Sequence, residues 1–266
     1  MNIPTKKRFA IKIEYDGTNF MGWQDQPNQR TVQSEIETAL EQISGKLTRI
    51  VGSGRTDSGV HALAQVAHFD IERDIFPNKI RLALNSLMDS DIVVIQCVEV
   101  KDNFHAQHDT KSKTYEYRIL NRSSESALRR LRAWHIRSNL NIDLMREASS
   151  HLIGKVDFAS FCQKKSLMSC NVRTLNILNI EESSDEIILR ITADGFLRHM
   201  VRNIVGTLVE VGRGERCPGN LPFLIESKDR TLAGPTAPSH GLFLANVDYG
   251  RDIFRIKNPK IGIEMS

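Results

Sequence analysis

The predicted order of strands and helices is the feature that most constrains how this chain can fold. Between residues 9 and 100, apolar residues first alternate as in a half-buried strand and then recur at helical spacing, and two strands, a helix and a strand follow. Residues 115–249 predict the same order again. This order, β-α-β-β-α-β, is that of a ferredoxin-like unit, which leaves one face of its sheet free. We therefore predict an α+β fold with two ferredoxin-like domains whose antiparallel sheets form a central cleft.

Two helices are predicted in the second half, on either side of a β-hairpin. Asp143 is the predicted N-cap of the first helix. The hairpin is predicted over residues 172–194. The second helix is predicted over residues 196–211, where apolar residues cover most of the circumference and leave Arg198 and Arg202 one turn apart on the same face.

The length of the chain agrees with two domains. At roughly 150 residues per domain, 266 residues correspond to about two of them. We place an N-terminal α+β domain at residues 1–107, which includes the glycine-rich candidate catalytic loop at residues 52–62, and a C-terminal α+β domain at residues 108–250. Residues 251–266 form a tail to which the sequence assigns no role.

Composition excludes several classes of protein. Hydrophobic residues make up 40% and charged residues 26% of the chain, which is typical of a soluble globular protein. The apolar runs are too short to cross a bilayer, and the N-terminal segment lacks the apolar stretch of an export signal. We therefore expect a cytoplasmic protein that does not bind membranes. The four cysteines form no Cys-x-x-Cys pair, which favours reduced thiols over disulfides or a zinc site.

The most unusual local sequence is GSGRTDSGVHA, at residues 52–62 between two predicted strands. Its glycines allow close approach to a ligand, and its short carboxylate, Asp57, is a candidate nucleophile or general base. The alternative is that Asp57 closes an Asx-turn and the glycines merely permit a tight connection. The spacing of the glycines matches neither a dinucleotide-binding nor a P-loop motif.

Several histidines lie near this loop and in the segment after residue 100, which makes a metal site an alternative. The candidate ligands are Asp57, His61, His68, His105 and His108. They form no His-Glu-x-x-His motif and have no cysteine partner at ligand spacing. We therefore interpret these histidines as hydrogen-bonded polar residues, and expect no metal.

Basic residues gather in three parts of the second half, and aromatic residues lie on its first predicted strand. Cations that bind phosphates, together with flat rings that stack on bases, are typical of an RNA-binding surface. The basic residues are Arg118, Arg122, Arg129, Arg130, Arg132 and Arg137, then Lys164 and Lys165, then Arg198, Arg202, Arg213 and Arg216.

Six segments together resemble the tRNA pseudouridine synthase A family, in the same order as in that family and across residues 8 to 249. The short GRTD segment alone would be a weaker signal than the six together. They are YDGTNFMGWQ (15–24), TVQSEIETAL (31–40), GSGRTDSGVHA (52–62), FHAQHDTKSKTYEYRI (104–119), RHMVRNIVGTLVEVGRG (198–214) and KDRTLAGPTAPSHGLFL (228–244).

The resemblance implies a pseudouridine synthase fold and an isomerase. Members of the family convert uridines at positions 38, 39 and 40 of the tRNA anticodon stem-loop to pseudouridine, which exchanges a carbon–nitrogen glycosidic bond for a carbon–carbon bond. No cofactor or metal is implied. The resemblance also implies a homodimer in which one tRNA contacts both subunits.

Site residues follow from the resemblance by motif. Asp57 matches the catalytic nucleophile, and Arg202 the arginine that forms an ion pair with it and keeps it ionised. Tyr115 matches the tyrosine that stacks on the target uracil and is a candidate base for its C5 proton. Leu242 matches an apolar residue of the same pocket, and Arg55 the residue that occupies the space left by the flipped base. Attack on uracil carbon 6 and attack on ribose carbon 1 both remain open.

Two positions depart from the family pattern. Gln107 stands where the family usually has arginine, which puts one cationic contact with RNA in doubt, and Ser58 replaces the commoner alanine after the aspartate. Two other functions remain open beside the isomerase: a non-catalytic tRNA-binding or folding protein, for which Asp57 would be dispensable, and a metal-dependent hydrolase, which chelation would inactivate.

Overall fold

The computed structural model describes residues 6–163 and 170–255. The first half contains β1 (Lys7–Tyr15), α1 (Val32–Ser44), β2 (Val51–Gly52), β3 (His61–Ile71), α2 (Pro77–Leu87) and β4 (Ile92–Val100). The second half contains β5 (Ser112–Asn121), β6 (Trp134–Ile136), α3 (Ile142–Ser150), β7 (Gly154–Asp157), β8 (Val172–Ser183), β9 (Glu186–Ala193), α4 (Met200–Gly212), α5 (Leu221–Ser227) and β10 (Leu242–Asp248). The order β-α-β-β-α-β, with short additions, is therefore present in both halves.

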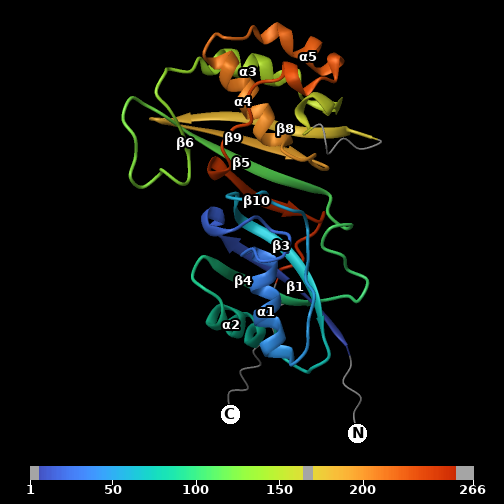
Figure 1. Ribbon diagram of the computed structural model, residues 1–266. Helices are drawn as coiled ribbons and strands as arrows, with labels where there is room; N and C mark the ends of the chain where they lie inside the picture. The colour runs from blue at the N-terminus through green and yellow to red at the C-terminus, as the bar shows by residue number, and fades with distance from the viewer. Residues whose placement is uncertain (1–5, 164–169, 256–266) are drawn as a thin grey trace, which may run out of the picture.

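The prediction of two separate antiparallel sheets is wrong, because all the strands belong to one mixed sheet. Its 10 strands run in the order β4-β1-β3-β10-β5-β9-β8-β7, with β2 on β3 and β6 on β5 off this path. The junction is β10, which pairs parallel to β3 and antiparallel to β5. In Figure 1, β10 and β5 lie between α1 and α2 at one end of the molecule and α3 to α5 at the other. The chain has a mixed α+β fold built on this sheet.

The sheets merge because the second strand of the first half is too short to close its edge. β2 has two residues and pairs only with His68 and Ala67 of β3, so the beginning of β3 is left without that neighbour. β10 pairs there instead, with Phe243 opposite His61. An unpaired strand edge is a template for another strand, and here β10 of the same chain occupies it.

Local sequence accounts for the elements that flank the site. β1 alternates as predicted, and its Phe9, Ile11 and Ile13 are fully buried. α1 begins at the N-cap Thr31, whose hydroxyl accepts from Ser34 N, and ends at Gly45 with a left-handed φ of 78°. In the described part of the chain, no helix is long and apolar enough to cross a membrane.

Two helix boundaries differ from the prediction. The N-cap of α3 is Asn141, whose side chain accepts from Leu144 N, whereas Asp143 lies in the first turn. α4 begins at Met200 because His199 has a left-handed φ of 63°, which interrupts the helix predicted from residue 196. Arg198 therefore precedes the helix and does not share a helical face with Arg202.

The arginine-rich segment of residues 118–137 is largely neutralised by carboxylates. Arg122 and Arg129 both contact Asp185, at 2.7 and 3.2 Å. Arg132 contacts Asp16 and so ties this segment to the first half. These ion pairs make the segment less positive than its arginine content indicates, and whether it binds phosphate stays a prediction. Lys164 and Lys165 of the second basic group lie outside the described residues.

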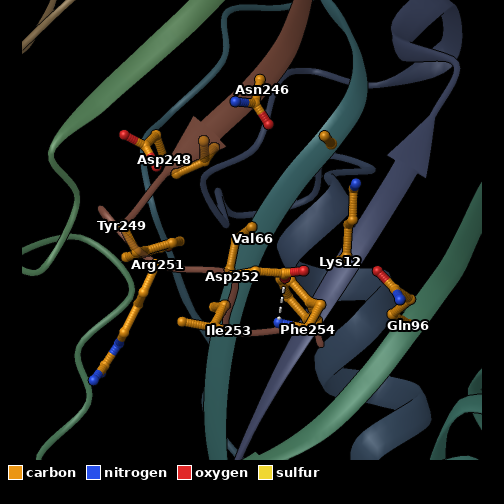
Figure 2. A pocket seen from close by; sticks show the side chains of 12 residues that line it. Lys12, Val66, Gln96, Asn246, Asp248, Tyr249, Arg251, Asp252, Ile253 and Phe254 are labelled. Atoms are coloured by element: carbon orange, nitrogen blue, oxygen red, sulfur yellow. Dashed lines mark hydrogen bonds between the residues drawn. The ribbon is translucent and has the colours of Figure 1, made fainter. Parts of the chain in front are cut away.

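The described part of the C-terminal tail packs back onto the first half. Ile253 and Phe254 contact the hydrophobic core, and with Lys12, Gln96 and Asn246 they line a cavity of about 340 Å³. Figure 2 shows the tail crossing the strands at this cavity, where Phe254 N donates to the Asp252 carboxylate. The tail is thus part of the packed structure up to residue 255.

Candidate active site

A cleft of about 1320 Å³ contains all five residues that the family motifs single out. Asp57 and Arg55 come from the loop between β2 and β3, Tyr115 from β5, Arg202 from α4 and Leu242 from the start of β10. These positions are far apart in sequence, and the merged sheet brings them to one place.

The loop that carries Asp57 is fixed on both sides of that residue. The Thr56 hydroxyl forms a 2.8 Å hydrogen bond with the buried Tyr15 hydroxyl. The Ser58 hydroxyl donates to the Phe20 carbonyl at 3.2 Å, so serine at this position is accommodated. The Asp57 carboxylate makes its contacts across the cleft and accepts no hydrogen bond from its own loop, which argues against the Asx-turn interpretation.

Glycine at residue 22 is required by this arrangement. Gly22 has a φ of 92°, and a Cβ there would lie 2.6 Å from the Thr56 carbonyl oxygen. Only glycine combines that backbone conformation with such a close approach. The segment after β1 therefore packs directly against the loop that carries Asp57.

Arg202 is held in place to face Asp57. Its Nη1 lies 3.4 Å from Asp57 Oδ2, and its Nε donates to the Ala237 carbonyl at 2.7 Å. The Ala237 N–H in turn donates to the Arg202 carbonyl at 3.1 Å. The guanidinium is thus oriented by the backbone of the 235–237 segment, and its positive charge stabilises the carboxylate.

His199 is a site residue that the motif reasoning missed. Its Nε2 lies 3.4 Å from Asp57 Oδ2, the same oxygen that Arg202 contacts. Both nitrogens approach Oδ2, and neither of these two contacts involves Oδ1. No spacing in the sequence marks His199, because it precedes α4 in a left-handed conformation and its position beside Asp57 depends on the fold.

The environment of His199 favours its neutral form. Burial is the main cause that lowers the pKa of His199 below its ordinary value, and the positive charges of Arg202, Arg198 and Arg230 act in the same direction. Asp57 opposes them. His199 can therefore contact the carboxylate as a neutral imidazole without competing with Arg202 for its charge.

Tyr115 and Leu242 form the apolar wall of the cleft. The Tyr115 ring packs edge-on against Phe196 at a centroid distance of 4.9 Å. Burial, and to a smaller extent Tyr15 and Asp57, raises the pKa of Tyr115, so its phenol is neutral in the free protein. Leu242 is buried and pairs with Tyr117 of β5.

The cleft carries positive charge that no described carboxylate neutralises. Asp57 is the only acidic residue among the described residues that line it, whereas Arg55, Lys113, Arg198 and Arg202 also line it. Within residues 6–163 and 170–255, no carboxylate forms an ion pair with Arg55, Lys113 or Arg198. This contrasts with the paired arginines of residues 118–137, and it suits an anionic ligand.

Gln107 and two of the histidines have clear positions. Gln107 lines the cleft, so the arginine that the family usually has there would have added one more cation. His61 Nδ1 accepts from Gly17 N at 3.0 Å, and His68 Nδ1 accepts from Ala106 N at 3.1 Å. These two histidines are hydrogen-bonded to the backbone.

The described residues contain no group of three or more side chains that could hold a metal ion.

Comparisons with known proteins agree on one family. The family model described as tRNA pseudouridine synthase matches residues 11–109 and 148–250. A tRNA pseudouridine synthase A of Shouchella clausii is 44% identical over 253 residues, covering 95% of this chain and 97% of that protein. One of Clostridium acetobutylicum is 44% identical over 243 residues, covering 91% of this chain and all of that protein.

A solved structure, the archaeal box H/ACA sRNP Nop10-Cbf5 complex, aligns over 79% of this chain and 55% of the matched chain at 14% identity, with a TM-score of 0.32. That likeness is too low to support the assignment, which depends on the family model and the two relatives. On the family match and on identities of 44% over nearly the whole length, this chain belongs to the tRNA pseudouridine synthase family.

Proposed function

We propose that this protein isomerises uridine to pseudouridine at positions 38, 39 and 40 in the anticodon stem-loop of tRNAs. The observation that carries the proposal is the Asp57 carboxylate held 3.4 Å from Arg202 in a cleft whose other charged lining groups are all cations. A single carboxylate surrounded by uncompensated cations suits a nucleophile that acts on a polyanion.

In this proposal Asp57 Oδ1 is the nucleophile. It adds either to carbon 6 of the uracil or to carbon 1 of the ribose, and in both routes the bond between N1 and carbon 1 of the ribose breaks. The detached base rotates, carbon 5 bonds to the ribose carbon, the C5 proton is lost and N1 gains a proton. The carboxylate is released at the end, so the reaction consumes no further reagent.

Tyr115, Leu242 and Arg55 are assigned to binding the flipped nucleotide. The buried Tyr115 ring, with Leu242 beside it, offers an apolar surface on which a uracil can stack. Burial raises the pKa of Tyr115 and keeps its phenol protonated. In this proposal Tyr115 accepts the C5 proton only after another group has removed the phenol proton. Arg55 is exposed on the cleft wall, where its side chain can enter the space left by the flipped base.

We also propose that the protein works as a homodimer in which one tRNA contacts both subunits. We further propose that residues 1–107 and residues 108–250 form two domains, and that the cleft lies between them. The uncompensated cations of the cleft support the assignment of tRNA as the partner.

Mapping pseudouridine in tRNA tests the proposed activity. Cells that lack this protein are expected to lose pseudouridine at positions 38, 39 and 40 and to regain it when the intact gene is returned. Pseudouridine elsewhere in the same tRNAs, made by other enzymes, is the internal control. Unchanged modification at all three positions would contradict the proposal.

Replacing His199 by glycine is expected to slow isomerisation by about 10- to 100-fold without weakening tRNA binding, because Asp57 would lose one of the two groups that orient it. Glycine tolerates the left-handed backbone at this position, so the fold is preserved. His199→Asn also tolerates that backbone and keeps an N–H donor, and is expected to retain more activity.

Single-turnover rates at saturating enzyme measure this effect, and added imidazole should partly restore the His199→Gly rate by occupying the vacated space. A purely structural role for His199 predicts no rescue by imidazole and equal losses in the two variants. That outcome would contradict the assignment of His199 as a positioning residue.

A further inference from the structure

Lys113 is a cation of the cleft that the proposed chemistry does not use. It lies on β5 two residues before Tyr115, so both side chains are on the same face of the sheet. It lines the cleft and is partly buried. Within the two described ranges, its ammonium group has no hydrogen-bonding or ion-pair partner.

The head of Lys113 rests against the catalytic loop at Gly54. A Cβ on Gly54 would lie 2.9 Å from Lys113 Nζ. The backbone of Gly54 does not have the left-handed φ that requires glycine. Gly54 therefore serves to leave room for the ammonium group, three residues before Asp57 in the same loop.

A buried ammonium group without a counter-ion is unfavourable in the free protein. Burial lowers the pKa of Lys113 below its ordinary value, and no neighbouring carboxylate opposes that effect. Most arginines elsewhere in the described chain have carboxylate partners, such as Arg122 with Asp185. An anion brought into the cleft by the substrate would therefore stabilise the charged form of Lys113.

We propose that Lys113 binds one of the two backbone phosphates that flank the target uridine. This inference rests on the proposed function, because it places the uracil on Tyr115 and the ribose at Asp57. The phosphates nearest to such a nucleotide are its own two. The Lys113 side chain extends from the strand of Tyr115 to the loop of Asp57, where its ammonium group lies beside Gly54. A phosphate bound to Lys113 would balance the positive charge of the ammonium group. It would also hold the ribose of the target uridine against the Asp57 carboxylate.

Salt-dependent binding gives the first test. Full-length protein with Asp57→Asn, which cannot turn over the RNA, is titrated with an anticodon stem-loop RNA at several salt concentrations. Adding Lys113→Met is expected to weaken binding about tenfold at low salt and to reduce the slope of log affinity against log salt by about 0.7–0.9. Lys113→Arg should keep the slope. Lys111→Met is the matched control, because Lys111 is exposed, lies outside the cleft, and should change neither value.

Neutral phosphate analogues give the second test and identify the phosphate. Stem-loop RNAs carry a methylphosphonate on the 5′ or the 3′ side of the target uridine. One of these should weaken binding to protein with Lys113 but cause no further loss with Lys113→Met, since the two changes remove the same contact. Gly54→Ala, which displaces the ammonium group without removing its charge, should reduce this coupling.

An unchanged salt slope for Lys113→Met would overturn the inference, and so would additive losses with both analogues. Activity on unmodified RNA is measured separately. Isomerisation without the coupling would reject the Lys113 inference and leave the proposed function standing. If the coupling is present but the unaltered protein does not isomerise the RNA, the proposed function is rejected and the contact between Lys113 and the phosphate stands.

Discussion

Replacing Asp57 by asparagine is expected to reduce pseudouridine formation by at least about 10⁴-fold, since an amide cannot form and release the covalent bond that the reaction requires. tRNA binding should change by no more than a few-fold. Asparagine has nearly the same shape as aspartate, and the cleft cations Arg55, Lys113 and Arg198 remain in place.

Single-turnover assays at saturating enzyme, with binding measured in parallel, separate these two effects. Asp185→Asn is the matched control. Asp185 is a carboxylate that also contacts arginine, at the turn between β8 and β9 and outside the cleft, and its replacement should leave the rate unchanged. Undiminished product from Asp57→Asn would favour the non-catalytic tRNA-binding protein over the isomerase.

Gly206→Ala is expected to lower the free energy of unfolding by about 3 kcal/mol or more. Gly206 is buried in α4, and a Cβ there would overlap the carbonyl oxygen of Pro235. The Cβ is fixed by the helix backbone, and the oxygen belongs to the backbone of Pro235. Neither a rotamer change nor a small shift of a side chain can therefore relieve the overlap. The 235–237 segment would have to move away from the helix.

Urea unfolding monitored by circular dichroism measures this effect, and Gly219→Ala is the matched control. Gly219 is exposed, and a Cβ there meets no atom within 4 Å, so its replacement should change stability by no more than about 0.5 kcal/mol. Any folded Gly206→Ala protein should also have reduced activity, because Ala237 orients the Arg202 guanidinium. Equal stability of the two variants would contradict the close packing of α4 described above.

The elements that depend on local pattern were predictable from sequence. β1 and α1 have the alternation, the cap and the terminal glycine that the residues indicate. The merging of the sheets was not predictable, because it depends on Phe243 pairing with His61 across most of the chain. The start of α4 was missed because the apolar spacing continues through residues that precede His199, and periodicity cannot reveal a left-handed residue.

The candidate site shows a similar division. Asp57, Arg202 and Tyr115 came from the family motifs, and the structure places them in one cleft. Their catalytic roles remain proposals. His199 and Lys113 could not be identified by motif, since their importance depends on what surrounds each side chain: the same carboxylate oxygen for His199, and no described anion for Lys113.

The central position of β10 has a consequence for how the protein is made. The ribosome delivers β10 after every other described strand, yet both β3 and β5 pair with it. Until residues 242–248 emerge, each half of the nascent chain presents an open strand edge, which can pair with another chain. A product that ends before β10 would therefore tend to aggregate, and the Asp57 loop and Tyr115 would come together only after β10 has been made.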